Sequence, residues 1–354
     1  MTSNEMTVAD KEHDARTEPA ATATMRAIVQ REVGGPEVLA IEEVPRPEPG
    51  EGQVRIRVAA AGVHAVDTDI RRGGGPPSMP QTALPMTPGR EIAGTVDAVG
   101  AGVDAGLLDT RVVAHVGFLN GGYAEYTLAP AAALHVLPDP VPFPQAVAAI
   151  GTGRTAQYVL ESAGMQETDV VVIPGASGGL GSQLVQLALS FGATVVALYG
   201  GEAKRDVVDR LAPDDERDAA RFIALDATDE DWPRHMTAVL GDREPSLLID
   251  GVGGATARAA LETLGRGARV VIIGWSSGDA VRIDTDDIIA RSLTVTVPLG
   301  RRIAQLRVIE ERALAAVADG TVSPPVDEYP LAEAAAAHAA IEQRRQQGKV
   351  VLIP

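Results

Sequence analysis

The sequence predicts an α/β protein in which an antiparallel β domain is followed by a doubly wound domain with a parallel sheet. Short alternating segments, separated by Gly and Pro clusters, run from Met25 to about Pro142 and are typical of antiparallel strands. After Pro144, wholly apolar strands alternate with helical patterns, as expected for a parallel sheet covered on both faces. These patterns predict two domains, which agrees with a length of 354 residues.

Composition narrows the classes of function. The chain has 31 basic and 48 acidic residues, a formal net charge of −17, so its average field repels nucleic-acid phosphates and anionic lipid. We therefore expect no nucleic-acid partner and no membrane partner. Cysteine is absent, which excludes disulfides, thiolate nucleophiles and every zinc site with a thiolate ligand.

The chain begins with a polar segment that is expected to stay unfolded. Residues 1–24 are rich in Thr, Ala, Glu and Asp and lack an apolar h-region, which predicts a disordered tail rather than a signal peptide. No later stretch has the roughly eighteen uninterrupted apolar residues of a membrane span. These features predict a cytoplasmic protein.

The expected elements divide the rest of the chain into three parts. Residues 25–145 form the β domain, with strands at 26–30, 38–42, 53–58, 94–100, 111–115 and 123–128. Residues 146–285 form the doubly wound domain, with strands at 170–173, 194–198, 222–225, 247–249 and 269–273. Residues 286–354 complete the first domain, with a strand-like run at 293–297, helices at 306–318 and after Leu331, and a last strand at 349–353.

A glycine cluster follows the first strand of the doubly wound domain. That strand ends in Pro174-Gly-Ala-Ser-Gly-Gly-Leu-Gly181, and a helical pattern follows from Leu184 to Leu189. Glycines are needed where a tight turn brings backbone N–H groups and a helix N-terminus against a pyrophosphate, because a Cβ would obstruct the approach. The sequence therefore predicts a dinucleotide-binding loop over residues 175–181.

The end of the next strand indicates which dinucleotide binds. An acidic residue at this tip selects the ribose 2′-OH of NAD, whereas basic groups select the 2′-phosphate of NADP. Here no carboxylate stands at the tip; Glu202 lies in the loop beyond, followed by Lys204 and Arg205. A phosphate favours Lys204, so we predict NADPH, with the alternative that Lys204 and Arg205 only solvate a helix start.

The glycine spacing also fits short-chain dehydrogenases, which need a Tyr four residues before a Lys. None of the five tyrosines has a Lys at that position. A β domain of this size ahead of the glycine loop is also foreign to that family. The short-chain class is therefore excluded.

The ordered motifs of residues 25–354 resemble the medium-chain dehydrogenase/reductase superfamily, and within it the zinc-free NADPH:quinone oxidoreductase (zeta-crystallin-like) family. The resemblance implies a GroES-like β domain, a Rossmann domain, an active cleft between them and commonly a homodimer. It rests on the segments Ala60–Gly73, Pro88–Gly94, Gly121–Glu125, Gly175–Gly181, Leu248–Gly253 and Gly348–Pro354.

The resemblance also implies the residues of the cofactor site. The pyrophosphate is expected at Gly175, Ala176, Ser177, Gly178, Gly179, Leu180 and Gly181. The adenosine phosphate end is expected at Tyr199, Gly200 and Lys204, and the ribose and nicotinamide at the loops Gly251-Val252-Gly253 and Gly274-Trp275-Ser276. Thr155 and Lys349 are expected as further cofactor contacts.

Departures from the family pattern mark the candidate catalytic residues. Zinc-containing branches have a Gly-His-Glu motif and cysteine ligands, whereas this chain has Gly89-Arg90-Glu91 and no cysteine, so no metal is expected. His64 stands where the quinone-reductase motif usually has Asn, and Asp69 where it usually has Tyr. His64 is a candidate proton donor or a hydrogen-bond partner of the nicotinamide amide, and Asp69 either orients His64 or faces solvent beside Arg71 and Arg72.

These features predict an NADPH-dependent enzyme that reduces quinones or α,β-unsaturated carbonyls. Without a metal, hydride addition to the far carbon of such a substrate needs only a few donors at the carbonyl oxygen. One alternative is an enoyl-thioester reductase, whose basic entrance Arg71, Arg72, Arg301 and Arg302 would provide. The other is a non-catalytic NADPH-binding protein.

Overall fold

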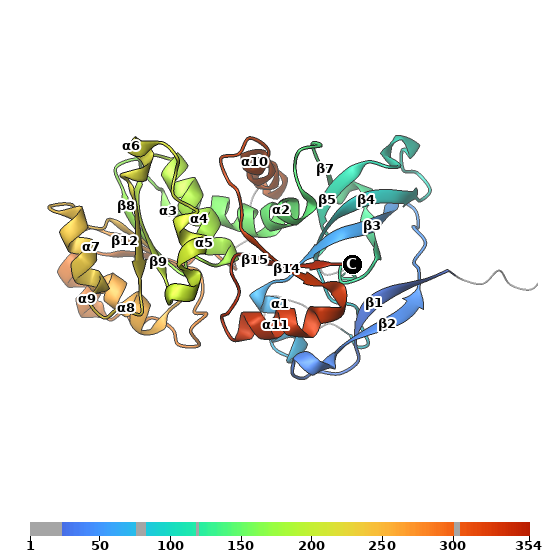
Figure 1. Ribbon diagram of the computed structural model, residues 1–354, viewed down its shortest axis with the longest axis horizontal. Helices are drawn as coiled ribbons and strands as arrows, with labels where there is room; N and C mark the ends of the chain where they lie inside the picture. Colours follow the sequence, from blue (N-terminus) through green and yellow to red (C-terminus); the bar gives the residue numbers. More distant parts are fainter. Residues whose placement is uncertain (1–22, 76–82, 118–119, 301–304) are drawn as a thin grey trace, which may run out of the picture.

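A computed structural model describes residues 23–75, 83–117, 120–300 and 305–354 (Figure 1). The expected tail therefore lies almost wholly outside the described residues, as do Arg301 and Arg302. Within the described ranges no helix is long and apolar enough to cross a membrane.

The β domain contains a two-stranded and a seven-stranded sheet. In the larger sheet the order is β14-β15-β3-β4-β5-β7, and β6 pairs with β3. All its pairs are antiparallel except that of β14 with β15. The strands are β1 (Thr24–Gln30), β2 (Leu39–Pro45), β3 (Gln53–Gly62), β4 (Glu91–Val99), β5 (Arg111–His115), β6 (Tyr126–Pro130), β7 (Leu134–Val136), β14 (Val326–Pro330) and β15 (Lys349–Ile353).

The Rossmann domain has a six-stranded parallel sheet in the order β10-β9-β8-β11-β12-β13. Numbered within the domain, the strand order is 3-2-1-4-5-6. The sequential order of the strands reverses between β8 and β11, and ligands bind at this position in such folds. The strands are β8 (Val170–Pro174), β9 (Thr194–Tyr199), β10 (Phe222–Asp226), β11 (Leu247–Asp250), β12 (Arg269–Ile272) and β13 (Thr294–Thr296).

Helices cover both faces of this parallel sheet (Figure 1). Helices α3 (Arg154–Ala163), α4 (Gly179–Ser190) and α5 (Arg205–Asp209) lie on the side of the β domain, and α7 (Trp232–Leu240), α8 (Gly254–Glu262) and α9 (Thr285–Arg291) on the other. The short α6 (Glu216–Ala219) leads into β10. Double coverage explains why β8 and β9 are buried along their whole length and read as continuous apolar runs.

The last part of the chain returns to the first domain, as predicted. The strand β15 pairs antiparallel with β3, where Val351 lies opposite Gly62 and Leu352 opposite Ala61. The predicted boundary at residue 285 comes too early, because β13 pairs in parallel with β12 and so extends the Rossmann sheet to Thr296. Helices α10 (Leu306–Ala318) and α11 (Ala334–Glu342) follow.

Two further helical segments carry residues next to the site. Helix α1 (Ala65–Arg71) follows β3 directly and begins after His64. Helix α2 (Phe143–Val147) continues through a π-helical turn, Ala148–Gly153, into α3. This continuous helix links the two domains and brings Gly151 against β4: a Cβ on Gly151 would lie 1.4 Å from Glu91 Oε1.

Candidate active site

The glycine loop has the close backbone packing that a pyrophosphate cradle requires. Gly175 has a φ of 74°, and helix α4 begins at Gly179. A Cβ on Gly181 would lie 2.1 Å from the carbonyl oxygen of Gly175, so no side chain fits there. The other domain contacts this loop, because the amide of Gly348 donates to the carbonyl of Ser177 at 2.8 Å. These features fit a dinucleotide phosphate group.

The two loops expected to flank the nicotinamide ribose lie side by side. The amide of Ser276 donates to the carbonyl of Gly251 at 3.0 Å. The buried carboxylate of Asp250 accepts hydrogen bonds from the amides of Val252 and Gly253, both at 2.9 Å. The Trp275 side chain is 59% exposed. Both loops therefore project from the carboxyl ends of β11 and β12, beside the glycine loop.

At the tip of β9, Lys204 lies close to a second cation. Burial lowers the pKa of Lys204, and the nearby charge of Arg344 lowers it further. Arg205, by contrast, points to solvent and pairs with Glu202 at 3.3 Å. A Cβ on Gly200, directly after β9, would meet no atom within 4 Å. Lys204 and Arg344 together form a site suited to an anion; Arg344 lies far along the chain and was not predicted.

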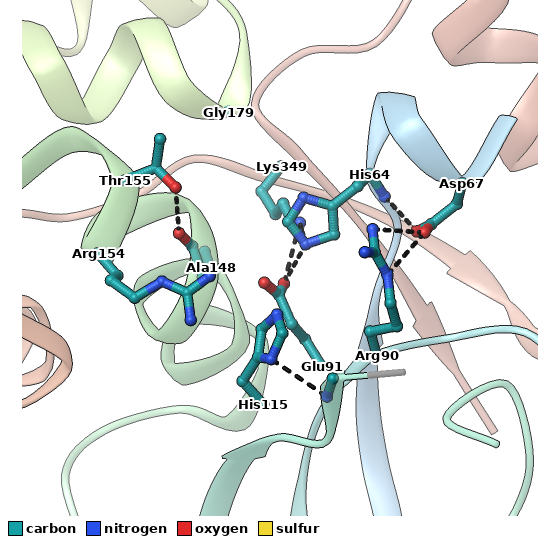
Figure 2. Close-up of polar contacts among 12 residues, drawn as sticks. His64, Asp67, Arg90, Glu91, His115, Ala148, Arg154, Thr155, Gly179 and Lys349 are labelled. Carbon is teal, nitrogen blue, oxygen red and sulfur yellow. Dashed lines mark hydrogen bonds and ion pairs between the residues drawn. The ribbon is translucent and has the colours of Figure 1, made fainter. Parts of the chain in front are cut away.

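Three ionisable side chains from different elements meet between the domains (Figure 2). His64 Nε2 lies 2.6 Å from Glu91 Oε2, and Lys349 Nζ lies 2.9 Å from His64 Nε2 and 3.2 Å from Glu91 Oε2. Glu91 is fully buried and the Lys349 side chain is 4% exposed, whereas that of His64 is 23% exposed. His64 is therefore the member of this cluster that reaches open space.

Charge balance holds the cluster together. Burial alone would raise the pKa of Glu91, but His64 and Lys349 hold it well below its usual range. Burial lowers the pKa of Lys349, against the opposing effect of Glu91. Burial also lowers the pKa of the neighbouring His115 to about 4, so that ring is neutral at pH 7. The cluster thus contains a carboxylate whose ionised form is favoured, with the buried Lys349 beside it.

Asp69 does not orient His64. Its side chain is half exposed and pairs with Arg72 at 2.6 Å, which agrees with the alternative that it faces solvent. The residue that contacts His64 from α1 is Asp67, which accepts from the His64 amide at 2.8 Å. The reason is helical geometry: Asp67 is the third residue of α1, where a carboxylate reaches back to the residue before the helix. The assignment of Asp69 as a catalytic residue stays a prediction.

Asp67 also belongs to a buried polar network that joins α1 to α11. Arg90 Nη2 donates to Asp67 Oδ1 at 2.9 Å, and the Tyr123 hydroxyl donates to Asp67 Oδ2 at 3.3 Å. His338 Nε2 lies 3.3 Å from that hydroxyl, and His338 Nδ1 lies 3.2 Å from Arg71 Nη1. This network fixes the start of α1 and hence the backbone of His64.

We expect His338→Gln to reduce the acid sensitivity of the fold. Burial lowers the pKa of His338 from 6.5 to about 4, so the unfolded chain binds more protons in this window and stability is lost as pH falls through it. His338 should cost the wild type about 2 kcal/mol between pH 7 and pH 5. Urea unfolding at both pH values measures this; equal losses in variant and wild type would contradict it.

The two remaining residues that were predicted to contact the cofactor, Thr155 and Lys349, form hydrogen bonds to other groups of the protein. The Thr155 hydroxyl donates to the carbonyl of Gly151 at 2.8 Å within its own helix. The backbone of Lys349 lies against the glycine loop, since a Cβ on Gly179 would be 3.0 Å from Lys349 Cα, but the ammonium turns to Glu91 and His64. Their role toward a cofactor stays a prediction.

Within the described residues, no group of three or more His, Asp or Glu side chains is placed to hold a metal ion.

A GroES-like β domain joined to a Rossmann domain, with a glycine loop at the domain boundary, defines a medium-chain dehydrogenase/reductase. Residues 50–139 match the family described as alcohol dehydrogenase GroES-like domain, and residues 217–352 the family described as zinc-binding dehydrogenase.

Whole-chain relatives narrow this class. Quinone oxidoreductase from Sus scrofa is 31% identical over 93% of this chain and 98% of its own. That from Pseudomonas aeruginosa is 30% identical over 91% of this chain and 97% of its own. The Escherichia coli quinone oxidoreductase, solved in complex with NADPH, has a TM-score of 0.78 and 28% identity, covering 93% and 100%. This chain therefore belongs to the quinone oxidoreductase family of medium-chain dehydrogenases/reductases.

Proposed function

We propose that this protein is an NADPH-dependent reductase of quinones or α,β-unsaturated carbonyls that works without zinc. The glycine cradle, with Lys204 in the segment that follows the tip of β9, is the observation that carries the proposal. NADPH-bound relatives with the same architecture support it.

The residues of this chain bind the cofactor and stabilise developing charge. Bound NADPH supplies a hydride from C4 of its nicotinamide. The amides of residues 175–181 and the start of α4 bind the pyrophosphate, and Lys204 with Arg344 binds the 2′-phosphate. As hydride adds, negative charge builds on the carbonyl oxygen of the substrate, where a hydrogen-bond donor lowers the barrier. His64 is the partly exposed side chain of the charged cluster and is the candidate donor.

The composition of the chain supports chemistry without zinc. Arg90 stands in the Gly-His-Glu position of the zinc branches, and its guanidinium binds Asp67. No cysteine is present to complete a thiolate site. An arginine cannot ligate a metal in its charged form, so the position no longer serves as a ligand.

Lys204→Ala is expected to weaken NADPH binding by about 10- to 100-fold, since one charge-assisted contact to a phosphate contributes about 1.5–3 kcal/mol. NADH affinity should change by less than about twofold, because NADH lacks the 2′-phosphate. Fluorescence titration with both nucleotides measures the two constants. An equal change in both, or in neither, would show that Lys204 does not read the 2′-phosphate.

The thioester alternative loses part of its support. Arg71 is 1% exposed and pairs with Glu342 and His338, and Arg72 pairs with Asp69 and Glu342. Neither is free to bind the phosphates of a CoA or phosphopantetheine arm. Arg301 and Arg302 lie outside the described residues.

The acceptor class can be tested by NADPH oxidation with four substrates: 1,4-benzoquinone, 9,10-phenanthrenequinone, a cyclic enone and crotonyl-CoA. We expect turnover with the quinones, and weak or absent turnover with crotonyl-CoA. Turnover of crotonyl-CoA alone would support the thioester reductase. NADPH binding without turnover of any acceptor would support the non-catalytic protein.

We also propose a homodimer. The edge strand β13 and the residues after it expose apolar side chains, including Val295, Val297 at 51% and Leu299. An exposed apolar sheet edge favours pairing with another chain. Sedimentation would test the dimer.

The predicted cytoplasmic location stays a prediction that cell fractionation would test.

A further inference from the structure

The chain has few side chains that react with electrophiles. It has no cysteine and only three lysines, Lys11, Lys204 and Lys349. Thiolates and neutral amines are the strong nucleophiles among protein side chains. Because Lys11 lies outside the described residues, the structure describes two candidate nucleophilic amines, Lys204 and Lys349.

Of these two amines, Lys204 is the accessible one. The Lys349 side chain is 4% exposed and its ammonium lies 3.2 Å from the carboxylate of Glu91, so an electrophile cannot reach it. Lys204 is half-buried, and no carboxylate pairs with it in the part of the chain that the structure describes. Burial and the charge of Arg344 lower the pKa of Lys204, which raises its fraction of neutral, nucleophilic amine.

One C-terminal segment contacts both the turn of Lys204 and the glycine loop. Gln347 Nε2 donates to the carbonyl of Ala203, next to Lys204, at 2.8 Å. The following residue, Gly348, donates its amide to the carbonyl of Ser177 in the glycine loop at 2.8 Å. Lys204 therefore lies at the border of the proposed cofactor site, on the side where the 2′-phosphate of bound NADPH would cover its amine.

We propose that Lys204 is a site of covalent modification by quinones that have an unsubstituted ring carbon, and that bound nucleotide shields it. The inference rests on the proposed function, which brings quinones and NADPH to the same site. The Nζ lone pair forms a bond to the unsubstituted ring carbon, and the electron pair of the C=C bond moves to the conjugated carbonyl oxygen. That oxygen takes a proton from the nitrogen.

The hydrogen of the attacked carbon then moves as a proton to the second quinone oxygen, which restores an aromatic ring. The product is an aminohydroquinone, and the reaction needs no further oxidant or reductant. An amine bonded to an aromatic ring is a weak base, so Lys204 loses its charge and carries a ring where the 2′-phosphate binds. Excess quinone should therefore inactivate the protein when NADPH is exhausted, whereas bound NADPH preserves it.

Treatment with 1,4-benzoquinone tests the proposal, with NADP⁺ as the shielding nucleotide because it cannot reduce the quinone. We expect peptide mass spectrometry to find the adduct on Lys204, and NADPH affinity to fall by about tenfold or more as the adduct forms. NADP⁺ at about ten times its dissociation constant should slow both changes about tenfold. The same concentration of NAD⁺, which lacks the 2′-phosphate, should slow them by less than about twofold.

A matched reagent and two matched variants serve as controls. Tetramethyl-1,4-benzoquinone, whose ring carbons carry no hydrogen, should form no adduct. Lys204→Arg keeps a cation that is not deprotonated in proteins, so its NADPH affinity should be the same before and after treatment. Lys11→Arg, the same substitution in a lysine outside the described residues, should lose NADPH affinity on treatment as the wild type does.

The outcomes separate this inference from the proposed function. Adducts confined to Lys11 or to the exposed His235 would overturn it, as would equal losses of affinity in treated Lys204→Arg and wild type. Equal protection by NADP⁺ and NAD⁺ would also overturn it. The proposed function is judged by NADPH oxidation with 9,10-phenanthrenequinone: turnover without a Lys204 adduct overturns this inference alone, and an adduct without turnover overturns the proposed function alone.

Discussion

Lys349→Met is expected to lower the free energy of unfolding by about 3–5 kcal/mol, the usual cost of leaving one partner of a buried ion pair uncompensated. The ammonium of Lys349 is buried and lies 3.2 Å from the carboxylate of Glu91, which is fully buried. Removing the cation leaves that carboxylate with His64 alone and favours its protonation. Urea unfolding at pH 7 measures the loss.

The matched controls separate charge from side-chain volume. Lys204→Met removes a half-buried lysine for which no carboxylate partner is found among the described residues, so it should cost less than about 1 kcal/mol. The double variant Lys349→Met with Glu91→Gln removes both charges and should recover at least half of the loss. A Lys349→Met variant within 1 kcal/mol of the wild type, or no recovery in the double variant, would show that the ion pair does not stabilise the fold.

Gly181→Ala is expected to weaken NADPH binding by about 100-fold or more, which is about 2.7 kcal/mol. The added Cβ would lie 2.1 Å from the carbonyl oxygen and 2.7 Å from the carbonyl carbon of Gly175. Both atoms are backbone, so the loop and the first turn of α4 must separate, and the amides that would hold the pyrophosphate move with them. Nucleotide titration gives the affinity, and circular dichroism reports whether the variant folds.

Gly200→Ala is the matched control, because its Cβ would meet nothing within 4 Å and its φ lies outside the left-handed region. It should leave the free energy of unfolding within about 0.5 kcal/mol of the wild type. Unchanged NADPH affinity in a folded Gly181→Ala protein would contradict the assignment of this loop as the pyrophosphate cradle.

Local sequence patterns predicted most of the fold because each pattern is contained within one element. The apolar runs of β8 and β9 and the glycines after β8 are contiguous, so they report strand, turn and helix without knowledge of the tertiary structure. The last strand was expected to return to the first domain, and β15 pairs there with β3. The strand-like run at 293–297 was predicted but assigned to the first domain, because a strand's sequence does not show which sheet it joins; β13 pairs with β12 instead.

The charged cluster could not be predicted because its members come from β4, β15 and the start of α1. His64 and Lys349 are 285 positions apart, and their contact is set by the pairing of β15 with β3. Asp67 could have been predicted from the sequence. His64 and Asp67 are spaced like the residue before a helix and the third residue of that helix. Glu91 carried a weaker signal, a carboxylate directly after Arg90 at the start of a strand.

The central claim is that this chain reduces quinones with NADPH and without a metal. The direct measurement is NADPH oxidation with 9,10-phenanthrenequinone by protein treated with a strong chelator and then freed of it by gel filtration, with zinc content determined on the same sample. We predict undiminished turnover with less than about 0.1 zinc per chain, since no thiolate ligand is available. Turnover that disappears on chelation and returns with added zinc would contradict the account.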